Sequence, residues 1–478
     1  MKNLLLLHRW LGVIACLAVL MFATSGLLHP IMSRTQPQPL QSSVPAAALP
    51  AGTLPLAEIL RRHGVAQFSA ANVAALPGGA AYRVQVDNNG ARYFAVADGD
   101  EIPNGEAQHA ELLARHFSGE SSAPLQELHE VTHFDDDYLW VNRLLPVWRA
   151  RFERADGLTI YVDTRGNRLA TIVDNRKRIL QTTFRNMHDF AFLEAVPWLR
   201  LPLMLVLLTA TFATAAAGLT LFFRLKNPAT RLQRAPLRRW HRRLALLVSL
   251  TTFSFSVSGS WHLLQSEVFA DNKAYPAVTD TFLTSELSAQ QPSSAFTLMR
   301  VHGTTCYRIA TAMAAAGGEH AHHAMPAQTT PISSAVTVNC IAADSGLPLV
   351  DAERNKAIEL ARRFSQTTAA PASAEIVDTF SGEYGFINKR LPVWKIQFSD
   401  GAPAAATRWY VEPSSGALAL RADNNAALEG FFFAYVHKWN FIGGDHQNIR
   451  DGLMMLFAFG NIVVAVLGLS LFIRRRRH

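Results

Sequence analysis

The chain has little cysteine and little charge for its length. Only three of its 478 residues are cysteine and 17% are charged, whereas 49% are hydrophobic. Cys16, Cys306 and Cys340 form no Cys-x-x-Cys-His motif, which argues against covalently attached haem. With a mean hydropathy of +0.09, the composition indicates a membrane protein with sizeable water-facing parts rather than an ordinary soluble protein.

Common catalytic and nucleotide-binding motifs are also absent. No Gly-x-Gly-x-x-Gly follows a predicted strand, and the sequence has no P-loop, no His-Glu-x-x-His and no Gly-x-Ser-x-Gly. The sequence therefore predicts neither a nicotinamide-binding domain of its own nor a recognisable hydrolase site.

Four apolar segments are long enough to cross a bilayer, which takes roughly 20 residues of helix. They are residues 10–32, 200–223, 244–265 and 452–473. The first follows Lys2 and Arg9, as a signal peptide would, but its apolar part is longer than usual and no clear cleavage site follows. We therefore expect residues 1–32 to be a retained transmembrane helix. No segment contains an acidic residue, which disfavours a metal transporter.

Basic residues predict the orientation of these segments, because short cytoplasmic loops collect Lys and Arg. Fourteen basic residues and no acidic ones lie at the start of the chain, between segments two and three (residues 224–243) and in the tail 474–478. Both termini are therefore predicted to be cytoplasmic, with loops 33–199 and 266–451 in the periplasm of a bacterium. The remaining 31 basic residues are outnumbered by 37 acidic ones, so no nucleic-acid partner is expected.

The two long loops are copies of one another. Loop one contains "NRLLPVWRARF" from Asn142 and loop two contains "NKRLPVWKIQF" from Asn388. "EAQHAELLARHFSG" is similarly matched by "DAERNKAIELARRFSQ", and the segment end "AAAGLTLFFR" by "AVLGLSLFIR". The chain is thus a tandem duplication of helix, external domain and helix, and we expect an axis along the membrane normal.

Alternating runs in both loops predict strands, and one amphipathic stretch in each predicts a helix. Examples of the strands are "YRVQV", "WRARFE" and "TIYVDT" in loop one and "YRIAT" in loop two. The fold class expected is therefore an α-helical membrane protein with four transmembrane helices and external antiparallel α+β domains, two small modules in each loop.

Six histidines recur as three matched pairs. They are His8 with His241, His29 with His262, and His188 with His437. The 21 residues between His8 and His29 correspond to roughly 31 Å of helix, close to the hydrocarbon thickness, and leave both side chains near one helical face. Facing helices that each supply an imidazole can ligate haem iron from both sides. The alternative is that these histidines contact lipid headgroups or cap helix ends.

Several sequence motifs of this chain are similar to those of one known family. "HRWLG" opens the first segment, "WHRRLAL" opens the third, and "W-x-x-x-F … Y-V-D-x-x-G" units recur in the loops. The chain resembles the PepSY-associated transmembrane family, sometimes called iron-regulated membrane proteins, over almost its whole length. The resemblance implies periplasmic PepSY-like domains and, as in members that reduce siderophore-bound iron, two b-type haems. Other members have no assigned activity.

Together these observations predict a dihaem reductase that carries electrons outward to a ferric-siderophore or other metal complex. His8 and His241 would serve a cytoplasmic-side haem, and His29, His262, His188 and His437 an outer site whose pairing stays open. Electrons would come from a quinol or a cytoplasmic donor, and membrane lipid would surround the helices. The alternative is a non-enzymatic PepSY module that binds or regulates a periplasmic protein or a metal.

Two smaller features lie in loop two. Cys306 and Cys340 are near strands that can form a hairpin, so we expect a disulfide, with two buried thiols as the alternative. Between them lies the insertion "GGEHAHHAMP", residues 317–326, which loop one lacks. Its residues His320, His322, His323 and Met325 could bind copper or zinc, or could form a hairpin tip without a specific ligand.

Overall fold

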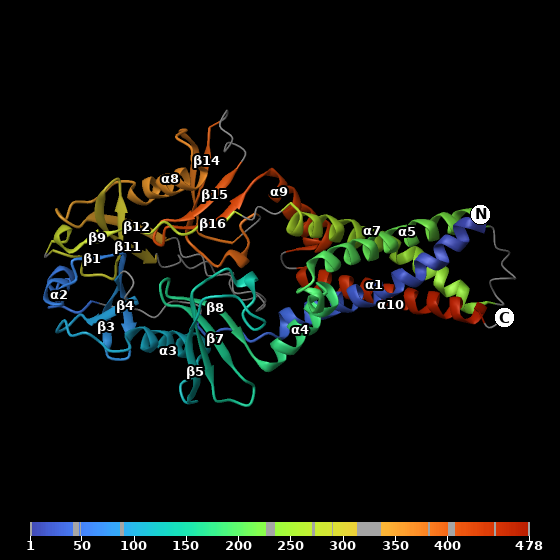
Figure 1. The fold of residues 1–478 in the computed structure, drawn as a ribbon, viewed down its shortest axis with the longest axis horizontal. Helices are drawn as coiled ribbons and strands as arrows, with labels where there is room; N and C mark the ends of the chain where they lie inside the picture. The colour runs from blue at the N-terminus through green and yellow to red at the C-terminus, as the bar shows by residue number, and fades with distance from the viewer. Residues whose placement is uncertain are drawn as a thin grey trace. The chain divides into compact units, whose positions relative to one another are not determined.

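The computed structural model describes residues 2–41, 47, 49–86, 90–225, 235–269, 273–288, 290–312, 336–380, 383–399, 407–443 and 446–476. The chain divides into two compact units (Figure 1). The helical unit comprises residues 1–36, 176–272 and 425–478, and the sheet unit comprises residues 37–175 and 273–424. The sheet unit therefore combines most of both predicted loops.

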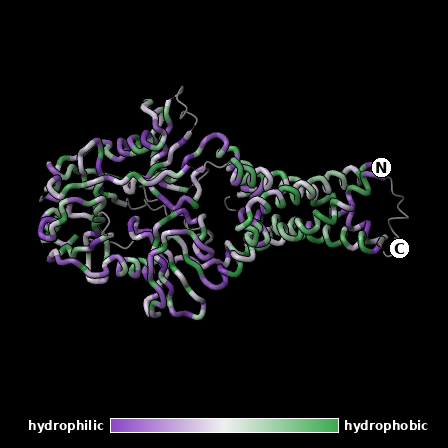
Figure 2. The backbone as a smooth tube through the Cα atoms, in the orientation of Figure 1, coloured by the Kyte–Doolittle hydropathy of each residue, from purple (hydrophilic) through white to green (hydrophobic). Residues whose placement is uncertain are grey.

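Within the part of the chain that the structure describes, the helical unit contains four helices that are long and apolar enough to cross a membrane. They are α1 (Lys2–Thr35), α5 (Pro197–Arg224), α7 (Pro236–Glu267) and α10 (Gln447–Arg476). Each contains one of the predicted apolar segments and extends beyond it, and Figure 2 shows hydrophobic residues along all four. The four predicted helices are confirmed.

These helices pack as a ring of four. The two helices that correspond in the duplication, α1 with α7 and α5 with α10, lie diagonally opposite each other. α1 contacts α5 and α10, and α7 contacts the same two helices. The Trp10 ring lies 5.5 Å from the Phe472 ring, so α1 begins beside the end of α10. We call this the basic end of the helical unit and the opposite end the domain end. Buried small residues such as Ala18, Ala210 and Ala458 allow the close helix approach typical of membrane bundles.

Two shorter helical segments precede α5 and α10 at the domain end. The first is α4 (Asn175–His188), and the second is α9 (Asn424–Phe431) continued by the π-helical segment η6 (Phe432–His437). Two residues after each matched histidine, the backbone turns left-handed, at Phe190 (φ 54°) and Trp439 (φ 53°). The duplication is therefore retained in local backbone geometry.

In the described residues of the sheet unit, the structure has antiparallel strands and three α-helices. The helices are α2 (Leu56–Arg62), α3 (Gly105–Ser118) and α8 (Ala352–Ser365). Strands from loop one are β1 (Gln67–Phe68), β2 (Ala70–Leu76), β3 (Gly79–Val86), β4 (Gly90–Ala95), β5 (Leu125–Val131), β6 (Val147–Phe152), β7 (Thr159–Asp163) and β8 (Arg168–Val173). Strands from loop two are β9 (Phe282–Leu283), β10 (Thr297–Val301), β11 (Thr304–Ala312), β12 (Val336–Ala342), β13 (Pro371–Val377), β14 (Val393–Phe398), β15 (Arg408–Glu412) and β16 (Ala417–Ala422). The predicted strands and both amphipathic helices are confirmed.

Among the described residues, two sheets combine strands of both loops. The smaller pairs β1 with β9. The larger has the order β12-β11-β10-β2-β3-β4, and its two halves join where Thr297 of β10 pairs with Asn72 of β2. Two further sheets, β5-β6-β7-β8 and β13-β14-β15-β16, each belong to one loop. α3 packs on the first of these through Leu113 and Phe117, and α8 packs on the second through Leu360 and Phe364. The modules nearest the start of each loop are therefore halves of one sheet.

A buried ion-pair cluster also links the loops. Glu412 accepts hydrogen bonds from Arg168 of loop one at 2.8 Å and from Arg390 of loop two at 2.6 Å. Its side chain is only 3% exposed. Although burial by itself would raise the pKa of Glu412, the Arg168 and Arg390 guanidiniums lower it to about 2. The carboxylate therefore stays ionised and is held by one cation from each copy.

Candidate functional site

At the basic end, the structure brings His8 of α1 and His241 of α7 together. Their ring centroids are 6.5 Å apart and their planes are inclined by 56°. Because α1 and α7 lie on a diagonal of the ring, the two imidazoles meet across the centre of the helical unit. This is the juxtaposition expected of equivalent residues related by the duplication.

Hydrogen bonds fix which nitrogen of each ring is free. His8 Nδ1 lies 3.0 Å from the Thr214 carbonyl oxygen, and His241 Nδ1 lies 3.2 Å from that of Val464. A carbonyl oxygen can only accept, so each Nδ1 carries the proton and donates. Each Nε2 then keeps a lone pair, and a carbonyl partner on the other nitrogen is the arrangement that orients histidines bound to metals.

Glycines keep the space beside these rings open. A Cβ atom added at Gly218 of α5 would lie 3.0 Å from His8 Cε1, and one added at Gly468 of α10 would lie 3.2 Å from His241 Cε1. Both glycines occupy the same position in their copies, within "AAAGLTLFFR" and "AVLGLSLFIR". Larger residues at either position would press on a candidate ligand.

At the domain end, the matched pair that meets is His188 and His437. Their ring centroids are 6.2 Å apart, with planes inclined by 75°. They come from α4 and η6 rather than from the long helices. The structure thus forms one facing pair at each end, and each pair takes one histidine from each copy.

Serine hydroxyls orient the second pair in the same way. Ser25 Oγ donates to the Phe22 carbonyl at 2.7 Å and therefore accepts from His188 Nδ1 at 2.8 Å. Ser258 Oγ donates to the Ser254 carbonyl at 2.7 Å and accepts from His437 Nδ1 at 3.0 Å. Here too each Nε2 keeps its lone pair. Ser25 and Ser258 recur before the matched histidines His29 and His262 as small residues that suit a flat cofactor, but their hydrogen bonds to His188 and His437 were not predictable from that repetition.

His29 and His262 contact phenyl rings that also contact this pair. Phe184 stacks on His188 at 4.8 Å between ring centroids and lies 5.9 Å from His29. Phe433 stacks on His437 at 5.5 Å and on His262 at 4.6 Å. His188 and His437 therefore form the facing pair of candidate ligands, and His29 and His262 are their neighbours.

The two flanking histidines differ in their polar partners. His262 Nδ1 lies 2.5 Å from the Glu429 carboxylate and donates to it. The position of copy one that corresponds to Glu429 is Leu180, which has no carboxylate. The domain end is therefore asymmetric, and sequence repetition gave no signal for Glu429.

The ring separation in both facing pairs is close to that expected of two imidazoles on one metal ion. A metal ion bound at about 2 Å by one nitrogen of each imidazole places the ring centroids about 6 Å apart, close to both observed separations. Among the described residues, no group of three or more His, Cys, Asp or Glu is placed to hold a metal ion. Two histidines suffice when a macrocycle supplies the other ligands, as in b-type haem proteins.

Comparison with known proteins adds no family assignment. No known family model matches this chain, and no curated protein matches it significantly. The resemblance to the PepSY-associated family therefore stays a prediction that rests on the residues themselves.

The remaining sequence candidates lie in the sheet unit or outside the described residues. Cys306 and Cys340 are buried free thiols on neighbouring strands β11 and β12, joined by a hydrogen bond that raises the pKa of Cys306 and lowers that of Cys340. Their disulfide stays a prediction. The insertion residues His320, His322, His323 and Met325 lie outside the described residues.

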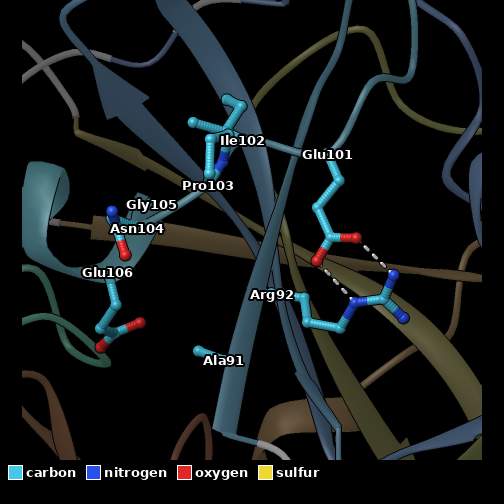
Figure 3. Close-up of a pocket in the computed structure, with 8 residues that line it drawn as sticks. All are labelled: Ala91, Arg92, Glu101, Ile102, Pro103, Asn104, Gly105 and Glu106. Atoms are coloured by element: carbon cyan, nitrogen blue, oxygen red, sulfur yellow. Dashed lines mark hydrogen bonds and ion pairs between the residues drawn. The ribbon is translucent and has the colours of Figure 1, made fainter.

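A pocket of the sheet unit lies beside β4 and the start of α3 and contains none of the predicted site residues. Arg92 and Glu101 form a two-bonded ion pair in it, at 2.8 Å and 2.6 Å (Figure 3). Glu106 also lines it and pairs with Arg83 at 3.1 Å. Because these charged groups are already paired, the pocket offers no evident catalytic group.

Proposed function

We propose that the chain is a b-type dihaem reductase of a bacterial cytoplasmic membrane. It would pass electrons across the membrane to a ferric complex in the periplasm, such as siderophore-bound iron or another metal chelate. The observation that carries the proposal is the pair of facing imidazoles at each end of the four-helix unit, His8 with His241 and His188 with His437.

The chain's own residues would hold and insulate the cofactors. A bound haem supplies one-electron chemistry, with imidazole nitrogens as its axial ligands. Carbonyl and serine acceptors on Nδ1 fix the ring orientations and leave Nε2 for the iron. The apolar helices between the two pairs exclude water and so help to set the reduction potentials.

The basic residues support the direction of transfer. The basic end carries Lys2, Arg9, Arg238 and Arg239, which favours its placement in the cytoplasm. Both termini would then be cytoplasmic and the sheet unit periplasmic, with PepSY-like modules shaping access for the chelate. The basic-end pair would receive electrons from a quinol or a cytoplasmic donor, and the domain-end pair would deliver them outward.

A visible spectrum of the detergent-purified protein tests the proposal. We expect about two b-type haems per chain by the pyridine haemochrome method, bands of six-coordinate haem in the dithionite-reduced protein, and reoxidation of that protein by a ferric chelate. A colourless protein from haem-replete cells would contradict the reductase and favour a non-enzymatic module that binds a periplasmic protein or a metal.

The glycine beside His8 should be needed for the basic-end haem. Valine at Gly218 places carbon atoms against the His8 ring, so we expect the Gly218→Val variant to lose about one haem per chain or to show it five-coordinate. The matched control is Gly452→Val on α10, where an added Cβ meets nothing within 4 Å. Unchanged haem content and spectrum in Gly218→Val would show that this space is not used.

A further inference from the structure

Lys438 places a cation beside the domain-end pair. It directly follows His437, and its Nζ atom lies 4.4 Å from the centroid of the Phe433 ring. That same ring stacks on His437 with an interplanar angle of 11°. The ammonium group therefore contacts the ring that contacts a candidate haem ligand.

Charged neighbours of Lys438 have partners, whereas Lys438 has none among the described carboxylates. Arg450 pairs with Asp451 at 2.9 Å, and Asp451 also binds Arg34 at 2.7 Å. Glu429, the carboxylate whose charge acts on Lys438, is engaged by His262 at 2.5 Å. A half-buried ammonium that no carboxylate contacts directly is costly, so this position is suited to a bound anion that the described residues do not supply.

The cation is a feature of one copy only. The residue that corresponds to Lys438 in copy one is Asp189, directly after His188. Both copies form the same helix-to-left-handed turn at this point, at Phe190 and Trp439. The fold therefore does not require a lysine at position 438, and the positive charge of Lys438 must have a reason other than the backbone turn.

We propose that Lys438 binds a propionate carboxylate of the haem held between His188 and His437. This inference rests on the proposed function and assigns that haem one specific anchor. The propionates are the charged groups of a b-type haem, and an ammonium–carboxylate contact is a strong charge-assisted hydrogen bond. One-electron reduction adds a negative charge at the iron, so a nearby cation stabilises the ferrous state and raises the reduction potential of this haem.

A redox titration of the full-length protein in detergent tests this assignment. We expect Lys438→Met to keep two haems and to lower the midpoint potential of one of them. A tenfold change in that reduction equilibrium corresponds to about 59 mV for a one-electron couple. Lys438→Arg should restore most of the potential, and the surface control Lys395→Met, which removes a weak pair with Glu375 at 3.7 Å, should leave both potentials unchanged.

The outcomes separate this inference from the proposed function. Two haems with unchanged potentials in Lys438→Met would overturn the propionate contact while leaving the dihaem protein intact. Loss of one haem in Lys438→Met but not in Lys438→Arg would support it, because the charge would then be needed for binding. If Lys438→Met only weakens the binding of anionic phospholipid vesicles, the anion is a lipid phosphate and the proposal is wrong. A wild-type protein without haem would contradict both proposals.

Discussion

Replacing His188 or His437 by alanine should remove about one of the two haems and leave the other unchanged. Each variant takes one imidazole from the pair whose ring centroids are 6.2 Å apart, so the iron at that site loses an axial ligand. His8→Ala and His241→Ala should remove the other haem, and the double variant His8→Ala/His437→Ala should remove both. Haem per chain and low-temperature difference spectra, which separate two b-type haems, measure the effect.

The flanking histidines and one surface histidine supply the controls. His29→Ala and His262→Ala should keep two six-coordinate haems, because these rings contact Phe184 and Phe433 rather than a ring of the facing pair in the described contacts. His129→Ala changes a side chain that is 45% exposed in the sheet unit and should have no effect. Loss of haem in His29→Ala together with full haem in His188→Ala would instead assign the ligand to His29.

The second large effect is expected at Glu412. Glu412→Gln keeps the size of the side chain but removes its negative charge. The two partly buried guanidiniums of Arg168 and Arg390 then lose the carboxylate that they share. Breaking a buried pair in this way costs about 3–5 kcal/mol. We expect a clear fall in the melting temperature of the sheet unit and faster cleavage by protease, measured by intrinsic fluorescence and limited proteolysis of the purified protein.

Acidification should have the same effect as the substitution. The pKa of Glu412 is lowered in the folded state to about 2, so its contribution to stability is complete above the usual carboxyl pKa and is lost as the pH falls towards 2. The melting temperature of Glu412→Gln should therefore fall less than that of the wild-type protein when the pH is lowered. Glu375→Gln, at an exposed pair with Lys395, is the matched control and should change little. If Glu412→Gln and Glu375→Gln had the same melting temperature, Glu412 would not be holding the two loops together.

Much of the helical unit could be predicted because its signals are local. Apolar length predicted the four helices, and repetition of His8 as His241 predicted that these two rings would meet across an axis. Which domain-end histidines meet was not predictable. His188 and His437 come from α4 and η6, outside the apolar segments, and only tertiary packing brings these rings between the long helices.

The parts that sequence reasoning missed are relations between distant residues. Alternation of polar and apolar residues predicted strands in each loop, but the pairing of Thr297 with Asn72 depends on how the two loops associate. Glu429 was missed because copy one has Leu180 at the same position, so repetition gave no signal. Ser25 and Ser258 did recur, yet small residues are common at helix contacts, and their roles became visible only with hydrogen-bond directions.

The division of each histidine pair between the two copies bears on how the protein arose. A half-length ancestor would hold one member of each pair, and half of the six-stranded sheet, so it could complete neither as a monomer. Two such chains related by a two-fold axis would complete both. Fusion of two such genes would make that assembly independent of concentration and would let the halves diverge. Asp189 opposite Lys438, and Leu180 opposite Glu429, are changes that an obligate homodimer could not have made on one side alone.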